Sequence, residues 1–210
     1  LDLKSPNIHS LPLTNQTHII IAAGCANING CEQNPKESYE VNVEGTLELA
    51  KQSIEKGLFP ILFSTDYVFD GKEGSYSETS KLNPINAYGR QKAELETRLS
   101  DVTDGNHLLL RLSKIYSSSA RDGSLLDEMI ASLLNRSPVY AATDQIFCPL
   151  NMDSLIEIMR NLIDQNIIGL INIGGKKSIS RYDLAINVCK NIDALESLVK
   201  PISLEAIPGS

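Results

Sequence analysis

The sequence predicts an α/β fold in which helices flank a doubly wound, mostly parallel sheet. Short apolar runs rich in Ile, Leu, Val and Phe alternate with longer segments of helix-forming residues, which is the pattern of β-α-β units. The chain has 210 residues, 42% of them hydrophobic and 21% charged. This length and composition suffice for one buried core, or for one core with a small additional lobe.

The expected elements follow this alternation in order. We expect strands at 18–21, 61–63 and 108–112, and a further short strand and turn within 168–175. We expect helices at 35–55, 87–99, 125–134, 153–164 and 181–192. In the first helix, Val41, Leu47 and Ile54 recur near the helical period and give one apolar face, and Gly57 ends it. The polar segment 72–86 is long enough to form a lid that faces a substrate.

Thr65, Tyr88 and Lys92 are the candidate proton-handling residues. Tyr88 and Lys92 stand four apart among helix formers, so both side chains should project from one helix face. A free phenol titrates near ~10, and a nearby ammonium group lowers that pKa. The Thr65 hydroxyl follows an apolar run and can donate to the same substrate oxygen from a strand end. A Tyr-x-x-x-Lys pattern alone favours an amphipathic surface helix, and the block 64–71 upstream, which places a hydroxyl at a strand end, reverses this in favour of a site.

Composition excludes several classes of function. The balance of 19 basic against 26 acidic residues gives a net charge of −7, which argues against non-specific nucleic-acid binding. No apolar run approaches the roughly 18 residues of a membrane span and no signal peptide opens the chain, so we expect a cytoplasmic protein without membrane contact. The four cysteines form no C-x-x-C pair, so we expect no metal and interpret them as reduced packing residues. A redox-sensitive thiol at Cys25 or Cys31 is the less favoured alternative.

Two motifs carry a resemblance to a known family. Ser-Thr-Asp-Tyr-Val-Phe-Asp-Gly at 64–71, followed by Tyr-Gly-Arg-Gln-Lys at 88–92, resembles the extended short-chain dehydrogenase/reductase family and, within it, the dTDP-4-dehydrorhamnose reductase branch. Further similar segments occur in the same order along the chain, at 17–23, 31–35, 41–46, 111–116, 144–149 and 180–183. Of these, 31–35 looks like a loop before the next helix.

The resemblance implies a Rossmann-like sheet that is incomplete at its N-terminus, with a small C-terminal α/β substrate lobe. It places a dinucleotide-binding core at 1–116 and a mainly substrate-binding lobe, interleaved with that core, at 117–210. The chain opens at a point that resembles the end of the family's third strand, without the glycine-rich turn that receives a pyrophosphate. We therefore expect residues 1–210 alone to bind a dinucleotide weakly.

The resemblance also implies an NAD(P)-dependent reductase of a nucleotide-activated keto-sugar, with NADP or NAD as cofactor and a homodimer as one possible assembly. The catalytic residues it implies are Thr65, Tyr88 and Lys92; those for the cofactor are Ala22, Ala23, Gly24, Asn42, Tyr88 and Lys92; those for the substrate are Asp66, Tyr67, Lys114 and Gln145. For Asn42 a solvated helix position is equally open, for Ala22–Gly24 a plain tight turn, and for Gln145 a structural turn.

Three positions refine this interpretation. Tyr67 follows Asp66 where the related dehydratases carry a Glu base, which favours reduction over dehydration. Lys114 stands where the reductase branch usually has an aromatic residue, which casts doubt on rhamnose as the sugar. We expect Arg111 to anchor its strand to a carboxylate rather than to touch substrate. The alternative function is a non-catalytic regulatory or scaffolding subunit, similar to the methionine adenosyltransferase regulatory subunit.

Overall fold

The structure is a computed structural model that describes residues 1–117 and 123–206. It consists of two compact units, and the chain passes between them more than once. Unit 1 comprises Leu1–Leu112 and Asp164–Asn172, and unit 2 comprises Ser113–Ile163 and Ile173–Ser210. Unit 1 thus ends a few residues before the predicted boundary at 116 and regains a short later segment. The functional assignment of the two predicted domains stays a prediction.

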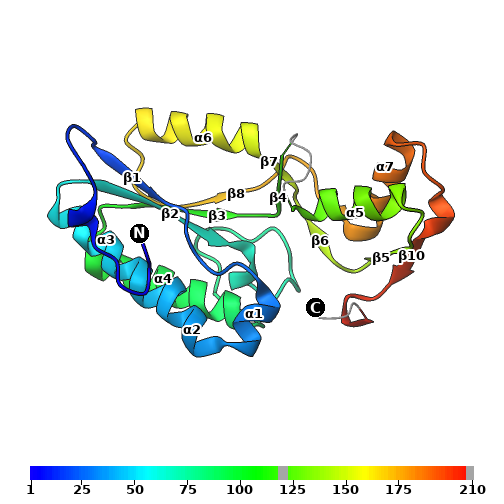
Figure 1. Cartoon of the computed structure of the whole chain (residues 1–210), viewed down its shortest axis with the longest axis horizontal. Coiled ribbons are helices and arrows are strands. Elements are labelled where there is room, and N and C mark those ends of the chain that lie inside the picture. Colours follow the sequence, from blue (N-terminus) through cyan, green and yellow to red (C-terminus); the bar gives the residue numbers. More distant parts are fainter. Residues whose placement is uncertain (118–122, 207–210) are drawn as a thin grey trace. The chain divides into compact units, whose positions relative to one another are not determined.

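Unit 1 is built on a four-stranded sheet in the order β1-β2-β3-β8 (Figure 1). These strands are β1 (His18–Ile21), β2 (Phe59–Thr65), β3 (Leu108–Leu112) and β8 (Gly169–Ile173). β2 runs parallel to both β1 and β3. The predicted α/β fold with a mostly parallel, Rossmann-like sheet is therefore confirmed, and because parallel strands end at the same edge, the residues that follow β1 and β2 lie together.

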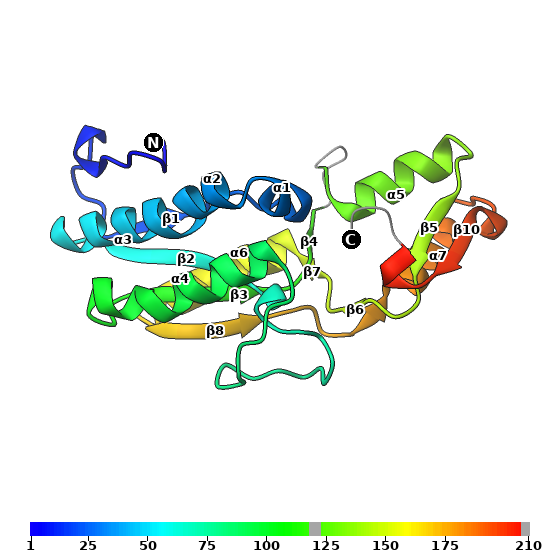
Figure 2. The ribbon, with the colours of Figure 1, turned by 90° about the horizontal axis from the view of Figure 1, so that it is seen from below.

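Helices α3 and α4 cover one face of this sheet (Figures 1 and 2). The helical elements are α1 (Ile28–Gln33), α2 (Pro35–Tyr39), the π-helical segment η2 (Glu40–Gly45), α3 (Thr46–Glu55) and α4 (Ala87–Thr103), with a 3-10 turn η1 (Ile8–Ser10). The core between helices and sheet contains Leu47, Leu62, Leu95, Leu99 and Leu109. The expected helix 35–55 contains a π-helical interruption, which adds a residue to one turn and re-aims the side chains there.

The prediction of a loop at 31–35 is wrong, because Cys31 lies in helix α1. Asn27 caps this helix by accepting a hydrogen bond from the Gly30 N–H, which supplies the local signal for a helix start. The prediction that Gly57 ends the following helix fits its backbone, which adopts a positive φ of 72° and donates to the carbonyl of Ile54.

The polar segment 72–86 is fastened to the rest of unit 1. It follows the 3-10 turn η3 (Asp66–Val68), and Figure 2 shows it in teal as a long loop near β8. The Asn172 side chain donates to the Tyr76 carbonyl (3.0 Å), and the Asn172 N–H donates to Glu78 (2.8 Å). Its role as a substrate lid stays a prediction.

Unit 2 has a smaller core of its own. Its strands are β4 (Ile115–Tyr116), β5 (Val139–Ala142), β6 (Ile146–Phe147), β7 (Leu150–Asn151), β9 (Ile179–Ser180) and β10 (Val199–Ile202). Its helical elements are α5 (Leu125–Leu134), α6 (Met152–Asp164), α7 (Arg181–Asn191), η4 (Glu196–Leu198) and η5 (Leu204–Ala206). Residues of α5 and α7 pack with the parallel pair β5/β10. Strands β5 and β10 were not predicted, because two alanines and Pro201 weaken their strand pattern.

Among the described residues, no helix is both long and apolar enough to cross a membrane. The same part of the chain holds no group of three or more His, Cys, Asp or Glu side chains that could bind a metal ion. All four cysteines are free. Cys31 and Cys189 are buried, and burial raises the pKa of both thiols, so these two are neutral packing residues at pH 7.

Candidate active site

Thr65 is the last residue of β2 and is buried at the carboxyl edge of the sheet. Its Oγ1 accepts a hydrogen bond from the Tyr67 N–H (3.3 Å) and so caps the turn η3. The same hydroxyl donates to Asp66 Oδ1 (3.3 Å), and it lies close enough to the Tyr88 phenol to lower the pKa of that phenol. The hydroxyl therefore has a structural role at the strand end and lies near the phenol with which its position predicted a pairing.

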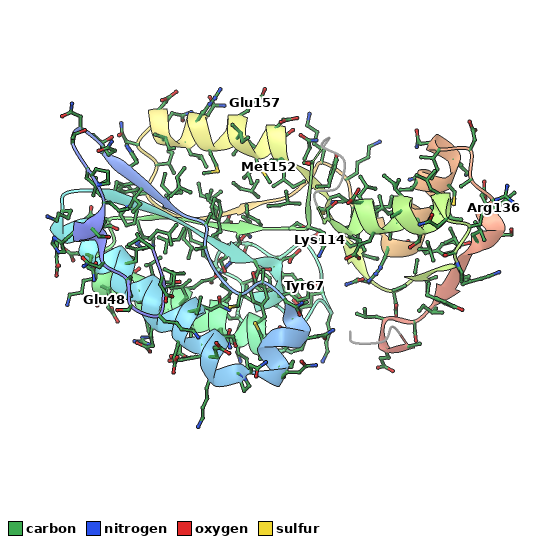
Figure 3. The ribbon with its side chains drawn as sticks, viewed as in Figure 1. Glu48, Tyr67, Lys114, Arg136, Met152 and Glu157 are labelled. Atoms are coloured by element: carbon green, nitrogen blue, oxygen red, sulfur yellow. The ribbon has the colours of Figure 1, made fainter. Side chains whose placement is uncertain are left out.

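Gly89 allows the start of helix α4 to approach this turn. Asn86 caps the helix by accepting a hydrogen bond from the Gly89 N–H (2.8 Å). A Cβ atom at position 89 would lie 2.2 Å from the Tyr67 carbonyl oxygen, so only glycine fits here. The close approach places the rings of Tyr67 and Tyr88 edge to face, with centroids 6.2 Å apart. Figure 3 labels Tyr67 just beyond the end of β2.

Lys92 lies one helical turn beyond Tyr88, as its spacing predicted, and is only 8% exposed. Its Nζ donates to the carbonyl oxygen of Phe63 on β2 (3.0 Å). Burial lowers the pKa of Lys92 to about 8, with Glu96 acting in the opposite direction. The ammonium form thus prevails at pH 7, and two of its three N–H groups are not used by this carbonyl.

The expected lowering of the Tyr88 pKa by Lys92 is not what the structure shows. Burial raises the pKa of Tyr88 to about 12, and Cys31 and Asp66 raise it further, while the Thr65 hydroxyl lowers it. The Lys92 ammonium is directed to the Phe63 carbonyl instead. Tyr88 is therefore a protonated phenol at neutral pH, which suits it to give a proton rather than to take one.

The predicted cofactor segment Ala22–Gly24 is exposed immediately after β1. It lies at the same sheet edge as Thr65, because Ile21 pairs with Leu62 in the parallel register of β1 and β2. Asn42 is fully buried, which excludes the solvated helix position. Its side chain accepts from the Cys25 N–H (2.7 Å) and donates to the Cys25 carbonyl (2.9 Å), so in this structure it holds the chain just after the cofactor segment.

The predicted substrate residues divide between the two units. Asp66, which is exposed, and Tyr67, which is half-buried, belong to unit 1 together with the proposed catalytic residues. Lys114 and Gln145 belong to unit 2. Lys114, also labelled in Figure 3, is exposed and lines a cavity of about 620 Å³ whose other walls include Leu126 and Leu184. The Oε1 atom of Gln145 is buried without a hydrogen-bond partner.

Two residues near the site were not selected as site residues from the sequence. Cys31 raises the pKa of both Tyr88 and Lys92, and its sulfur lies 3.8 Å from Asn42 Nδ2. Gln91 is 5% exposed and accepts a hydrogen bond from Asn42 (2.8 Å). The only available signal was position, since Gln91 precedes Lys92 and Cys31 lies in a segment with family resemblance. Arg111, by contrast, pairs with buried Glu96 (2.7 Å), which confirms the predicted carboxylate anchor.

The fold is that of an extended short-chain dehydrogenase/reductase. The family described as RmlD substrate binding domain matches residues 4–210, and the chain belongs to this family. The chain is 30% identical over 177 residues to a dTDP-4-dehydrorhamnose reductase of Aggregatibacter actinomycetemcomitans, covering 81% of this chain and 59% of that protein. It is 29% identical over 188 residues to a probable low-salt glycan biosynthesis reductase of Haloferax volcanii, covering 87% of this chain and 62% of that protein.

Methionine adenosyltransferase 2 subunit beta of Bos taurus is 26% identical over 221 residues, covering 99% of this chain and 64% of that protein. Among solved structures, the dTDP-4-dehydrorhamnose reductase of Bacillus anthracis in complex with NADP matches with a TM-score of 0.83 and 25% identity, covering 90% of this chain and 66% of that one. The chain thus spans less than two thirds of the length of each of these relatives, and the similar proteins include both reductases and a subunit of a methionine adenosyltransferase.

Proposed function

We propose that this chain is part of an NAD(P)-dependent reductase that acts on a nucleotide-activated keto-sugar, in the manner of a dTDP-4-dehydrorhamnose reductase. The observation that carries the proposal is the gathering of buried Thr65, Tyr88 and buried Lys92 at the carboxyl edge of a parallel sheet, where Lys92 bonds to β2 and the Tyr88 ring contacts Tyr67 just after Thr65. Two reductases among the similar proteins, and a solved reductase complex with NADP, support it.

In this proposal Thr65 and Tyr88 both bond to the carbonyl oxygen of the sugar. The Tyr88 phenol, protonated because its pKa is about 12, gives its proton to that oxygen as the carbonyl is reduced to an alcohol. The Thr65 hydroxyl polarises the same carbonyl and stabilises the negative charge that develops on the oxygen. Asp66, next to Thr65 and exposed, is placed to accept a hydrogen bond from a sugar hydroxyl.

The residues of unit 1 fit a dinucleotide next to this pair. Small, exposed residues Ala22–Gly24 leave their backbone open to close approach at the edge where Thr65 lies. The ammonium of Lys92 retains N–H groups that suit a ribose hydroxyl. A bound nicotinamide would supply the hydride.

The second candidate is a non-catalytic regulatory subunit. Lys114 favours it, because the position departs from the aromatic residue of the reductases, as does the similarity of nearly the whole chain to methionine adenosyltransferase 2 subunit beta. The intact Thr65, Tyr88 and Lys92 favour the enzyme.

The test is a reductase assay of the full-length protein. NADPH or NADH is supplied with a panel of nucleotide-activated 4-keto-sugars, and both loss of the reduced nicotinamide and formation of the sugar alcohol are measured. We expect stoichiometric conversion of at least one sugar. A protein that converts none of the panel, yet binds a methionine adenosyltransferase catalytic subunit and changes its activity, would establish the regulatory alternative instead.

A further inference from the structure

Unit 1 contains a network of buried amide and hydroxyl groups that links three helical elements. Its members are Asn42 on η2, Gln91 on α4 and Ser38 on α2, which are 0%, 5% and 4% exposed. The three residues lie on three different helical elements, and Gln91 is far from the other two in sequence. Their hydrogen bonds therefore depend on how these elements are packed.

The first link joins Asn42 to the segment after β1. The Asn42 carboxamide bonds to both the N–H and the carbonyl of Cys25, which leaves one Nδ2 hydrogen free for another acceptor. That hydrogen is donated to Gln91 Oε1 (2.8 Å). Asn42 also lies directly against Gly24, where an added Cβ would come within 3.1 Å of its Oδ1. The position of the predicted cofactor segment is thereby coupled to a side chain of α4.

The second link joins Gln91 to α2. Because Gln91 Oε1 accepts from Asn42, its Nε2 must face the other way, and it donates to Ser38 Oγ (2.8 Å) and to the Pro35 carbonyl (3.3 Å). Ser38 Oγ in turn donates to the Asn34 carbonyl (2.9 Å). Donors and acceptors alternate along this series of hydrogen bonds. Only one orientation of the Gln91 carboxamide therefore satisfies Asn42, Gln91 and Ser38 together.

Gln91 lies three residues after Tyr88 and directly before Lys92, so it belongs to the same helical turns that carry the proposed proton-handling residues. A helix turns by about 100° per residue. A fixed carboxamide at position 91 therefore fixes the rotation of α4 and with it the directions of Tyr88 and Lys92.

We infer that Gln91 is a positioning residue that holds the helix with Tyr88 and Lys92 in register with the segment Ala22–Cys25. The inference rests on the proposed reductase function for its kinetic readout, but the mechanical coupling between the two segments does not depend on it. Gln91 acts through Asn42 and Tyr88 and needs no contact with the reacting atoms.

The test compares two matched substitutions in the full-length protein. Gln91→Met removes the carboxamide at similar volume, and Gln52→Met does the same to a glutamine of α3. The Gln52 carboxamide likewise bonds to backbone groups, at Ile8 (2.9 Å) and Pro6 (3.0 Å), but on a different helix. We expect Gln91→Met to lower kcat by at least about tenfold, since small misplacements of reacting groups carry large penalties, and Gln52→Met to lower stability without lowering kcat.

A third variant, Gln91→Glu, makes the position titratable. Its buried carboxylate would face the Pro35 carbonyl, whereas the protonated acid can still accept from Asn42 and donate to Ser38, and burial raises the pKa of such a group. The turnover of Gln91→Glu relative to wild type should therefore recover as the pH falls. A purely structural loss would leave this ratio flat.

Amide hydrogen exchange provides the readout that is independent of turnover. In Gln91→Met, exchange at Cys25 and in the first turn of α4 should both accelerate, and in Gln52→Met neither should. If the wild-type protein shows no reductase turnover, the proposed function is rejected. The exchange comparison then still tests the coupling between α4 and the segment Ala22–Cys25. Unchanged exchange at Cys25 in Gln91→Met, or an equal loss of kcat in the two Met variants, would overturn the inference.

Discussion

Unit 1 and unit 2 differ in how completely their buried polar side chains are hydrogen-bonded. In unit 1, the guanidinium of Arg111 bonds to Glu96, to the Glu78 carbonyl and to Asn172. In unit 2, the Nε atom of Arg181 and the Oε1 atom of Gln145 are buried without hydrogen-bond partners. Unit 1 therefore has the completed polar networks that fix side chains in one arrangement, which is what a proton-transfer site needs.

The two units also differ in the side chains that fill their apolar cores. The core of unit 1 contains large, fully buried side chains such as Leu62, Leu95 and Leu99. The core of unit 2 includes the small residues Ala141 and Ala185, and its cavity of about 620 Å³ lies beside this core. The cavity of about 560 Å³ in unit 1 is instead lined largely by polar and charged residues such as Glu32, Lys36 and Arg90. We interpret unit 1 as the part that fixes the chemistry and unit 2 as the part in which substrate preference is most easily changed.

The largest effect on stability is expected from a comparison of two arginine substitutions, one in each unit. Arg111→Leu should reduce the free energy of unfolding by about 3 to 5 kcal/mol, because Glu96, whose side chain is 5% exposed, would be left as an unpaired buried charge. Arg181→Leu should cost less than about 1 kcal/mol, since its Nε has no partner to lose. Urea unfolding of both variants provides the measurement. Similar losses in the two would show that the units do not differ in this way.

Lys92 provides a pH-dependent test of unit 1. Its folded pKa of about 8 lies below the ordinary value of 10.5, so the unfolded chain binds more protons between these pH values. The free energy of unfolding should therefore rise with pH across this window by roughly 3 kcal/mol relative to Lys92→Met, and this contribution is lost again as the pH falls through 8. The measurement is urea unfolding at several pH values.

The exposed Lys81 serves as the control, because the free energy of unfolding of Lys81→Met should rise with pH as much as that of the wild type. Taking the difference between variants cancels the contribution of Tyr88, whose raised pKa of about 12 stabilises the fold below pH 10 and is lost as the pH rises through 12. A Lys92→Met protein with the same pH profile as wild type would contradict the lowered pKa.

Tyr88→Phe tests the proposed chemistry directly. We expect turnover to fall by at least about 10²-fold, or about 2.7 kcal/mol, because a positioned acid is lost while the ring and its packing remain. Tyr39→Phe is the matched control, since the pKa of Tyr39 is likewise raised to about 12 but its hydroxyl bonds to Glu94. Near wild-type turnover in Tyr88→Phe with every accepted sugar would reject the catalytic assignment.

The smallest effect on stability is expected at Lys114. Lys114→Trp should change the preference among keto-sugar nucleotides while altering the free energy of unfolding by no more than about 0.5 kcal/mol, because the side chain is exposed at the cavity of unit 2. The readout is kcat/KM across the sugar panel beside the melting temperature. A large drop in melting temperature with an unchanged sugar preference would show that Lys114 is structural.

The sequence alone determined the features that depend on neighbouring residues. Apolar runs located β1, β2 and β3, and helix-forming segments located α4 and α5, because strand and helix periodicities are written into short stretches of chain. The four-residue spacing placed Tyr88 and Lys92 on one helix face, and the run before Thr65 placed its hydroxyl at a strand end.

Only the tertiary structure decided which distant groups meet and how deeply they are buried. Gln91 bonds to Asn42, 49 residues earlier, and Asn42 to Cys25, 17 residues earlier, and no local pattern specifies either pair. Likewise, burial lowers the pKa of Lys92 and raises that of Tyr88, and the Tyr88 shift is opposite to the lowering expected from its spacing to Lys92. Spacing along a helix fixes direction, whereas dielectric environment and long-range hydrogen bonds are properties of the packed fold.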